Sequence, residues 1–401
     1  MPNSLNRSVA LLLVACLLGA LISIHFPQPL HAAAGTEGAS FLSIPVGGGP
    51  AALGAAYTAS ANDAYAPVWN PAGLGFLDST QISGQHLSYL DPDHYEYVSF
   101  VHPLNRNPNC SVSSFCTSSG IGASLQYFGS GNIPGRDASG YSTGNFSNHY
   151  AAYNLAYGRT VNENLSWGLT GKWINAQLDD VSANAYAADL GGMFKANEHL
   201  TLAATLTNLG TKLTFLDEGD SLPLAFHLGA AYHPSYSWSF TGEGVYAESG
   251  QASGHIGLEW KPMELISLRA GYRTDTLNGL SALAGFTTGL GLQVWGQELD
   301  YAWLPLGDLG DTQYLSMIIR FGEAGRDRRN LIQYRHLARR NEKEAGWLEL
   351  EREEITRLLM DSSEKESVNR SPSDLTDTST LAPLPKTTPN DGHPASAEGA
   401  H

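Results

Sequence analysis

Apolar and polar residues alternate with a period of two through most of the chain between about residue 80 and Phe321. In one segment Leu165, Trp167 and Leu169 occupy every second position, with a serine and a glycine between them. Successive side chains of a strand point to opposite faces, so this alternation predicts strands with one apolar face and one polar face. The same pattern recurs in the segments Ile256–Trp260, Leu268–Tyr272, Leu299–Trp303 and Leu315–Phe321.

Fourteen such segments are expected, each about ten residues long, which is the length that a tilted strand needs to cross a bilayer. They begin near residues 80, 94, 119, 148, 164, 184, 199, 223, 236, 253, 264, 279, 290 and 312. Trp and Tyr stand near many segment ends, where membrane barrels carry aromatic girdles. Examples are Tyr89, Tyr127, Tyr157, Trp173, Tyr272 and Trp303.

A soluble β-sandwich would show the same alternation. In lipid, however, only a closed barrel satisfies every backbone hydrogen bond between strands. Segment length, aromatic ends and an export signal together favour the membrane. The sequence therefore predicts an all-β fold, an antiparallel transmembrane β-barrel of about 14 strands over residues 79–321.

The connections between segments indicate an orientation. An even number of strands puts both barrel ends on one side, which we expect to be the periplasmic side of a Gram-negative-type outer membrane. The connection 159–163 is short, as periplasmic turns are. The connections 105–120 and 129–147 are long and polar, so both are predicted to lie outside.

Residues 1–34 have the layout of a secretory signal peptide. Arg7 precedes an apolar run over 9–24, and small residues follow at 32–34. One alternative is a retained membrane anchor. Another is a lipoprotein signal cleaved before Cys16, although the apolar run continues past that cysteine.

Removal of the signal leaves two cysteines, Cys110 and Cys116, in a loop rich in Asn and Ser. In an exported protein such a pair forms a small disulfide, and two free thiols are the alternative. No His lies nearby at ligand spacing, so a zinc site is not expected there.

The chain carries 39 acidic and 23 basic residues, which gives a net charge of −16. A phosphate backbone is bound by clustered Lys and Arg, so this balance excludes a nucleic-acid partner. Charged residues make up only 15% of the chain and become much denser after residue 321. Such a change marks a domain boundary.

Residues 322–367 are predicted to form a charged helical extension. Leu331, Ala338 and Ala345 recur every seven residues and belong to an interrupted heptad stripe. One interpretation is a solvated helix against the barrel rim. The other is a periplasmic helix whose residues 325–367 dock a secretion-system or other periplasmic protein. Residues 368–401, rich in Ser, Thr and Pro, are expected to be a disordered tail.

Motifs of catalysis occur in contexts that do not support them. Gly140–Gly144 matches G-x-S-x-G, but a nucleophile elbow needs a buried strand before it and a helix after it, and a polar loop surrounds it here. The enzyme alternative is a lipase that pairs Ser142 with His149. Gly47–Ala52 fits a dinucleotide fingerprint only loosely, and no βαβ rhythm follows it.

The remaining polar candidates are predicted to be structural. The adjacent pair Asp179–Asp180 would face opposite ways on a strand, so a loop tip is expected. The 13 His form no metal-binding motif. His227 and His233 share one face of a strand and are predicted to line the lumen. We therefore expect no catalytic residue, no metal site and no cofactor, in a protein that is not an enzyme.

Residues 35–78 do not alternate and are rich in small residues, which suit short helices packed inside a larger structure. The segment closes with the motif Trp69, Asn70, Pro71, Ala72 and Gly73. Pro71 biases the residue before it away from helix, and Gly73 can take a left-handed backbone. This motif predicts a tight turn that directs the chain into the first strand.

The stretch from Gly35 to Leu74 also resembles a known family. Its distinctive pieces are Phe41–Leu42, Gly54–Ala59, Asn62–Ala64 and Trp69–Leu74, and later pieces that fit are Asn208–Gly210, Leu222–Pro223, Arg269–Tyr272 and Leu299–Ala302. These are similar to PorV/PorQ family proteins, which are relatives of FadL-like long-chain fatty-acid transporters. The resemblance implies a 14-stranded FadL-like barrel whose N-terminal segment plugs the lumen.

The resemblance also implies two roles. The first is a non-enzymatic outer-membrane barrel, in contact with outer-membrane lipid, that handles or passes hydrophobic small molecules in the FadL manner. The alternative is an accessory or cargo-shuttle barrel of a type IX-like protein secretion system.

Overall fold

The structure is a computed structural model and describes residues 37–89, 93–105, 117–131, 133–249, 252–275, 282–307 and 310–321. The chain divides into two compact units between Arg329 and Asn330, and the described residues all belong to the first unit. Several predictions lie outside the described residues. They are the signal peptide, the cysteine pair Cys110 and Cys116, the charged extension 322–367 and the tail 368–401.

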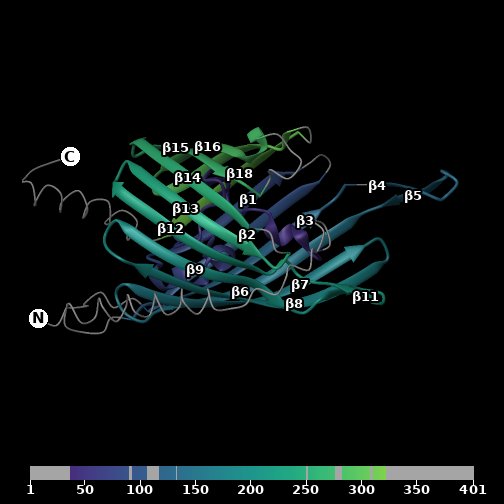
Figure 1. Ribbon diagram of the computed structural model, residues 1–401, viewed down its shortest axis with the longest axis horizontal. Helices are drawn as coiled ribbons and strands as arrows, with labels where there is room; N and C mark the ends of the chain where they lie inside the picture. The colour runs from purple at the N-terminus through teal and green to yellow at the C-terminus, as the bar shows by residue number, and fades with distance from the viewer. Residues whose placement is uncertain are drawn as a thin grey trace, which may run out of the picture. The chain divides into compact units, whose positions relative to one another are not determined.

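Fourteen antiparallel strands close into a barrel (Figure 1). They are β1 (Thr80–Ser88), β2 (His94–Asn105), β3 (Ser119–Gly129), β6 (Asn148–Thr160), β7 (Leu165–Leu178), β8 (Val181–Lys195), β9 (Leu200–Gly210), β12 (Ala225–Ser235), β13 (Trp238–Ala247), β14 (Ala252–Met263), β15 (Ile266–Arg273), β16 (Phe286–Val294), β17 (Gln297–Pro305) and β18 (Asp311–Phe321). Two hairpins stand outside the ring, namely β4 (Ile133–Arg136) with β5 (Ser142–Phe146), and β10 (Leu213–Phe215) with β11 (Glu218–Asp220). The predicted fold class is confirmed.

The predicted strand starts agree with the structure to within a few residues, except for two that lie seven residues too early. Residues 282–285 form the short helix η3 (Ala282–Gly285), so β16 begins only at Phe286. β17 begins at Gln297 because Trp295 and Gly296 form the preceding turn, with φ of 53° and 83°. Two positive φ values are the geometry of a tight hairpin turn. A tryptophan gives no turn signal, so the alternation was read through it.

Two rims can be defined from strand pairing. Thr80, where β1 begins, pairs with Phe321, where β18 ends, and this end is called the terminal rim. The opposite end, where Ser88 pairs with Gln313, is called the loop rim. The turns 161–164, 236–237 and 264–265 at the terminal rim are short, whereas both extra hairpins rise from the loop rim.

The prediction that connections 105–120 and 129–147 lie on the same side is wrong. Both flank the single strand β3, which pairs with β2 and β6 along its whole length. Consecutive antiparallel strands reverse direction, so the connections at the two ends of one strand open at opposite rims. The first therefore opens at the terminal rim and the second at the loop rim.

The two faces of the barrel wall follow the predicted alternation. On β7, Leu169 and Trp173 are 44% and 45% exposed, whereas Thr170 and Ile174 are fully buried. Exposed apolar side chains project outward from strands all around the ring, among them Ile82, Phe100, Leu155, Leu190, Leu202, Leu228, Phe240, Ile256, Leu268, Leu290, Leu299 and Leu315. Polar side chains such as Gln81, Ser166, Arg269 and Asp300 point inward and are buried.

Aromatic residues border this apolar belt. Near the terminal rim, Tyr157 contacts Trp167, and Trp238 stacks on Trp260. Toward the loop rim, Tyr153 stacks on Trp173. A closed ring with an apolar exterior between aromatic girdles is the architecture of a transmembrane barrel. No helix in the described part of the chain is long and apolar enough to cross a membrane.

Tyr89 does not belong to a girdle, contrary to the prediction. Its side chain packs against Phe128 with ring centroids 6.0 Å apart and lines a cavity inside the barrel. Tyr89 follows the end of β1, where the chain leaves the strand alternation, so the pattern did not determine its direction.

The depth of the outer face gives a testable prediction. On β7 the outward side chains are apolar from Leu165 to Trp173 and polar at Asn175, which places Leu169 near the middle of the belt. We expect Leu169→Arg to lower the unfolding free energy in lipid vesicles by about 2–4 kcal/mol, and Leu165→Arg at the rim by about 0–1 kcal/mol. Denaturant titration in vesicles measures both. Equal effects at the two positions would contradict a membrane centred on this belt.

Residues 37–79, called the inner segment, lie within the ring of strands (Figure 1, purple). Their helices are short: η1 (Ser40–Ser43), α2 (Gly48–Ala52), α3 (Ala66–Trp69) and η2 (Pro71–Phe76). Inward side chains of the wall bond to the segment's backbone from several sides. The bonds include Gly48 N to Ser316 Oγ of β18 at 2.8 Å, Gly54 N to Thr287 Oγ1 of β16 at 3.0 Å, Ser166 Oγ of β7 to Ala72 O at 2.7 Å and Ser99 Oγ of β2 to Ala64 O at 2.6 Å.

Wall glycines allow the backbone of the inner segment to approach the strands. At Gly168 on β7 a Cβ atom would lie 2.2 Å from the carbonyl carbon of Pro71. At Gly271 on β15 it would lie 2.1 Å from the backbone nitrogen of Gly54. Similar contacts involve Gly120, Gly158, Gly191, Gly257 and Gly289. The inner segment therefore sits directly against two sectors of the wall, β3–β8 and β14–β16.

Candidate functional site

Three cavities lie between the inner segment and the wall. The loop-rim cavity, of about 460 Å³, reaches the loop-rim ends of β12 to β15 at Ala225, Ala247, Ala252 and Arg273. The side cavity, of about 520 Å³, lies at the same rim beside Tyr89 and Phe128. The terminal-rim cavity, of about 320 Å³, is lined by Gln81, His233, Lys261 and Arg320 near the opposite rim.

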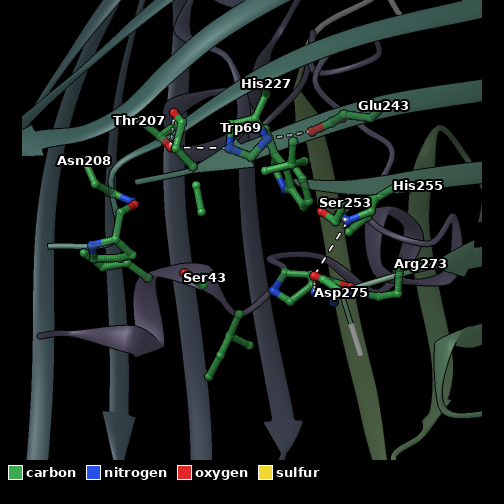
Figure 2. A pocket seen from close by; sticks show the side chains of 18 of the residues that line it. Ser43, Trp69, Thr207, Asn208, His227, Glu243, Ser253, His255, Arg273 and Asp275 are labelled. Carbon is green, nitrogen blue, oxygen red and sulfur yellow. Dashed lines mark hydrogen bonds and ion pairs between the residues drawn. The ribbon is translucent and has the colours of Figure 1, made fainter. Parts of the chain in front are cut away.

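The loop-rim cavity has two chemically different sides (Figure 2). The inner segment supplies an apolar side through Leu42, Ile44, Val46, Val68 and Trp69. The wall supplies a polar side through Thr207, Asn208, His227, Glu243, Ser253, His255 and Arg273. Cavities of about 300–1,000 Å³ that combine apolar surface with a few placed polar groups are typical of small-molecule sites. This cavity is the candidate functional site.

His227 and Glu243 tie the wall to the inner segment. His227 Nδ1 lies 2.8 Å from Glu243 Oε1, and Glu243 Oε2 accepts the backbone N–H groups of Tyr57 and Thr58, each at 3.0 Å. A buried carboxylate is stable when such donors surround it. The pair therefore anchors the inner segment to β12 and β13.

Thr207 lies 3.4 Å from His227 Nε2, so the order of groups is hydroxyl, imidazole and carboxylate, as in a catalytic triad (Figure 2). The contact is long, and the Thr207 hydroxyl also donates to the carbonyl of Ala225 at 3.3 Å. Both oxygens of Glu243 are already bonded. We interpret this group as a structural anchor and not as a nucleophile with its base.

A second polar group lies where β14 and β15 reach the loop rim. Arg273 grips Asp275 with two nitrogens, of which Nε lies 2.7 Å from Oδ1. His255 Nε2 lies 3.2 Å from Ser253 Oγ and 3.7 Å from Asp275 Oδ2. Burial alone would raise the pKa of Asp275, but the hydrogen bonds from Arg273 and His255 hold that pKa well below its usual range. The Asp275 carboxylate therefore remains ionised opposite Arg273.

A third ion pair closes the opposite side of the cavity. Lys172 Nζ lies 2.7 Å from Asp189 Oδ2 and donates to Asn208 Oδ1 at 2.7 Å. Asn208 has a φ of 62° at a bulge between β8 and β9, and its backbone N–H donates to Asp189 Oδ1 at 2.7 Å. The bulge re-aims the asparagine into the lumen, where it completes the lysine's coordination.

Tyr57 and Trp69 lie between the loop-rim and terminal-rim cavities. Trp69 lines the first and Tyr57 lines the second, and their rings meet edge to face with centroids 5.7 Å apart. Trp69 Nε1 donates to Val46 O at 2.8 Å, and the Tyr57 hydroxyl donates to Asp63 at 2.5 Å. Burial raises the pKa of Asp63, against the hydrogen bonds from Tyr57 and Tyr65 that favour its ionised form. This ring pair is the partition between the two cavities.

The terminal-rim cavity is surrounded by an ion-pair network. Arg269 Nε lies 2.8 Å from Glu259, Nη2 lies 2.7 Å from Glu298, and Nη1 bonds to Asp300. Arg320 reaches Glu298 at 2.7 Å, and Lys261 reaches Glu259 at 3.0 Å. The network joins four adjacent strands, β14, β15, β17 and β18, on their lumen face.

The predicted turn motif lies at the centre of the inner segment. Asn70 is extended, with φ −160°, as the following proline predicts, and its side chain accepts the Ala72 N–H at 3.1 Å. Pro71, Ala72 and Gly73 begin η2, which leads into β1. Gly73 does not adopt a left-handed backbone. A Cβ there would lie 1.6 Å from Ala61 O, so close approach is what requires glycine.

The predicted lumen-lining histidines are confirmed, since His227 lines the loop-rim cavity and His233 the terminal-rim cavity. Asp179 and Asp180 form an exposed turn between β7 and β8, as expected of a loop tip. Ser142 lies on the exposed strand β5, and no hydrogen bond joins it to His149 among the described residues. The same part of the chain holds no group of three or more His, Cys, Asp or Glu that could bind a metal.

Comparison with known families places the chain. The model of the uncharacterised protein family UPF0164 matches residues 31–242, which is more than half of the sequence. The chain belongs to the UPF0164 family. The UPF0164 match runs from before the inner segment into β13, so it includes the inner segment and Thr207, Asn208 and His227 of the site. No curated protein matches the sequence.

Solved structures with a similar course of chain include two barrels. The toluene transporter TbuX of Ralstonia pickettii has a TM-score of 0.48 and 13% identity, with 69% of this chain and 98% of TbuX covered. A FadL homologue of Pseudomonas aeruginosa has a TM-score of 0.43 and 12% identity, with 68% and 96% covered. The 14-stranded barrel is confirmed by the strand topology. Membership of the PorV/PorQ family stays a prediction.

Proposed function

We propose that this UPF0164 barrel resides in the outer membrane and passes small amphipathic molecules through its lumen without covalent chemistry. The observation that carries the proposal is the loop-rim cavity, whose apolar inner-segment side faces a polar wall. A molecule with an apolar body and a polar end matches both sides at once.

The route follows from the position of the cavities. The loop rim carries the longer connections and the terminal rim the short turns, so the loop rim is proposed to face outward and both barrel ends the periplasm. A molecule bound in the loop-rim cavity reaches the terminal-rim cavity when Tyr57 and Trp69 separate. The inner segment thus acts as a plug, and passage requires only a shift in its population of states.

Uptake by whole cells tests the proposal. A Gram-negative host that produces the protein is expected to take up N-phenyl-1-naphthylamine, a neutral amphipathic dye, several times faster than the same host without it. Val245 faces into the loop-rim cavity from β13, so Val245→Trp fills the cavity and is expected to return uptake to background. Equal uptake with and without the protein would overturn the proposal.

The partition predicts a second effect. Trp69→Ala removes the indole between the two cavities and is expected to raise single-channel K⁺ conductance in planar bilayers above the wild-type level. Trp295→Ala changes a residue that is 86% exposed in a tight turn and serves as the matched control. Unchanged conductance in Trp69→Ala would show that the ring pair is not the closing element.

The alternative role in protein secretion depends on residues 325–367, which lie outside the described residues. No feature of the described barrel favours it over the passage of small molecules.

A further inference from the structure

The cationic side chains that line the loop-rim cavity are already paired. Among the described lining residues these are Lys172 and Arg273. Lys172 lies 2.7 Å from Asp189, and Arg273 holds Asp275 with two nitrogens. A ligand that enters the cavity therefore meets each of these cations with a carboxylate already bound to it.

Carboxylates also line the cavity directly. Glu37, Glu243 and Asp275 are among the lining residues, against the two cations. A carboxylate ligand would lose its hydration, would be repelled by these groups, and could gain a cation only by breaking an existing pair. Burial of a charge without a partner costs several kcal/mol. The electrostatics of the cavity thus disfavour an anionic head group.

One polar group of the cavity lacks a partner. His255 is 6% exposed, and its Nδ1 has no hydrogen-bond partner within the described part of the chain, while Nε2 is taken by Ser253. An unsatisfied buried nitrogen of this kind gains about 1–3 kcal/mol from a hydrogen bond. Figure 2 shows His255 and Ser253 beside Asp275 and Arg273, across from Ser43 of the inner segment.

We infer that the loop-rim cavity selects uncharged amphiphiles over carboxylates of the same length. The apolar chain lies against Leu42, Val68 and Trp69, and a hydroxyl or carbonyl head bonds at His255. This inference rests on the proposed function, because it names the class of molecule that the same cavity admits.

The test compares two probes that differ only in the head group, 1-octanol and octanoate at pH 8. Calorimetric titration uses the full chain in lipid nanodiscs, with empty nanodiscs subtracted. We expect 1-octanol to bind at least about tenfold more tightly than octanoate, which corresponds to about 1.4 kcal/mol. Octanoate that binds as tightly as 1-octanol, or more tightly, would overturn the inference.

Two substitutions locate the selectivity. His255→Leu is expected to weaken 1-octanol about tenfold, the equivalent of one hydrogen bond, with octanoate unchanged. Asp275→Asn removes the carboxylate opposite Arg273 and is expected to strengthen octanoate about tenfold or more. Wild-type selectivity in both variants would refute the assignment of His255 and Asp275.

The outcome also separates this inference from the proposed function. Preference for octanoate together with dye uptake leaves the transport proposal intact and refutes only the choice of head group. Failure of both probes to bind refutes the inference, and the transport proposal falls with it only if dye uptake also equals background. Val245→Trp should abolish binding of 1-octanol, since it occupies the same space.

Discussion

Replacement of Gly168 by leucine is expected to displace the inner segment and open the barrel. A Cβ at this position would lie 2.2 Å from the carbonyl carbon of Pro71 and 2.4 Å from the nitrogen of Ala72. Both atoms belong to backbone, which cannot turn aside as a flexible side chain can. Overpacking costs about 1–3 kcal/mol even where side chains adjust. The strain is relieved only when η2 moves away from β7.

The displaced state should be measurable as an open pore. Each 1.4 kcal/mol changes an equilibrium about tenfold, so we expect the time-averaged K⁺ conductance of Gly168→Leu in planar bilayers to rise by at least about tenfold. Gly171→Leu is the matched control, because Gly171 lies on the same strand and a Cβ there meets nothing within 4 Å. Heat-modifiable mobility in SDS gels verifies that both variants still form the barrel. A folded Gly168→Leu barrel with wild-type conductance would contradict the role of the wall glycines.

The sequence predicted the barrel because lipid and lumen impose opposite polarity on alternate residues. Leu165 to Trp173 show this on β7, and the structure keeps every one of them on the predicted face. The prediction failed where a turn lacked its usual residues, as at Trp295. It also failed where a rule of topology was not applied, as for the two connections that flank β3.

The candidate site was predictable only in part. The placement of His227 and His233 in the lumen follows from the period of two, since both occupy one face of β12. The partners of these groups do not follow from it, because strand register decides that His227 stands opposite Val245 and beside Glu243. The pairing of Arg273 with Asp275 depends likewise on how the chain leaves β15.

The wall glycines show the same limit. Within a strand, Gly168 or Gly271 looks like a weak strand former, and its value appears only when the inner segment lies against it. Gly73 was assigned a backbone role and has a packing role instead. Contacts between residues about one hundred positions apart in the chain leave no periodic signal at either residue.

Replacement of Arg269 by methionine is expected to destabilise the barrel more than any other single change in the terminal-rim cavity. Arg269 is 7% exposed and bonds to Glu259, Glu298 and Asp300, which come from two other strands. Methionine keeps much of the side-chain volume but leaves the buried carboxylates without this partner. Removal of one member of a buried ion pair costs about 3–5 kcal/mol. We expect a loss of this size in the unfolding free energy, measured by denaturant titration in lipid vesicles.

The design separates lost charge from lost packing. Arg136→Met is the control, because Arg136 is exposed on β4 and donates to the carbonyl of Gly140, and its loss should change stability by less than about 0.5 kcal/mol. Asp300→Asn added to Arg269→Met removes one of the orphaned charges and should recover part of the loss. If Arg269→Met cost less than about 1 kcal/mol, the network would be a set of solvated pairs of the kind found on surfaces. Because the same arginine joins β15 to β14 and β17 beside the cavity, its loss should also loosen the wall against which α2 packs. Val68 and Trp69, which face the other cavity, should then remain the part of the inner segment that is least disturbed.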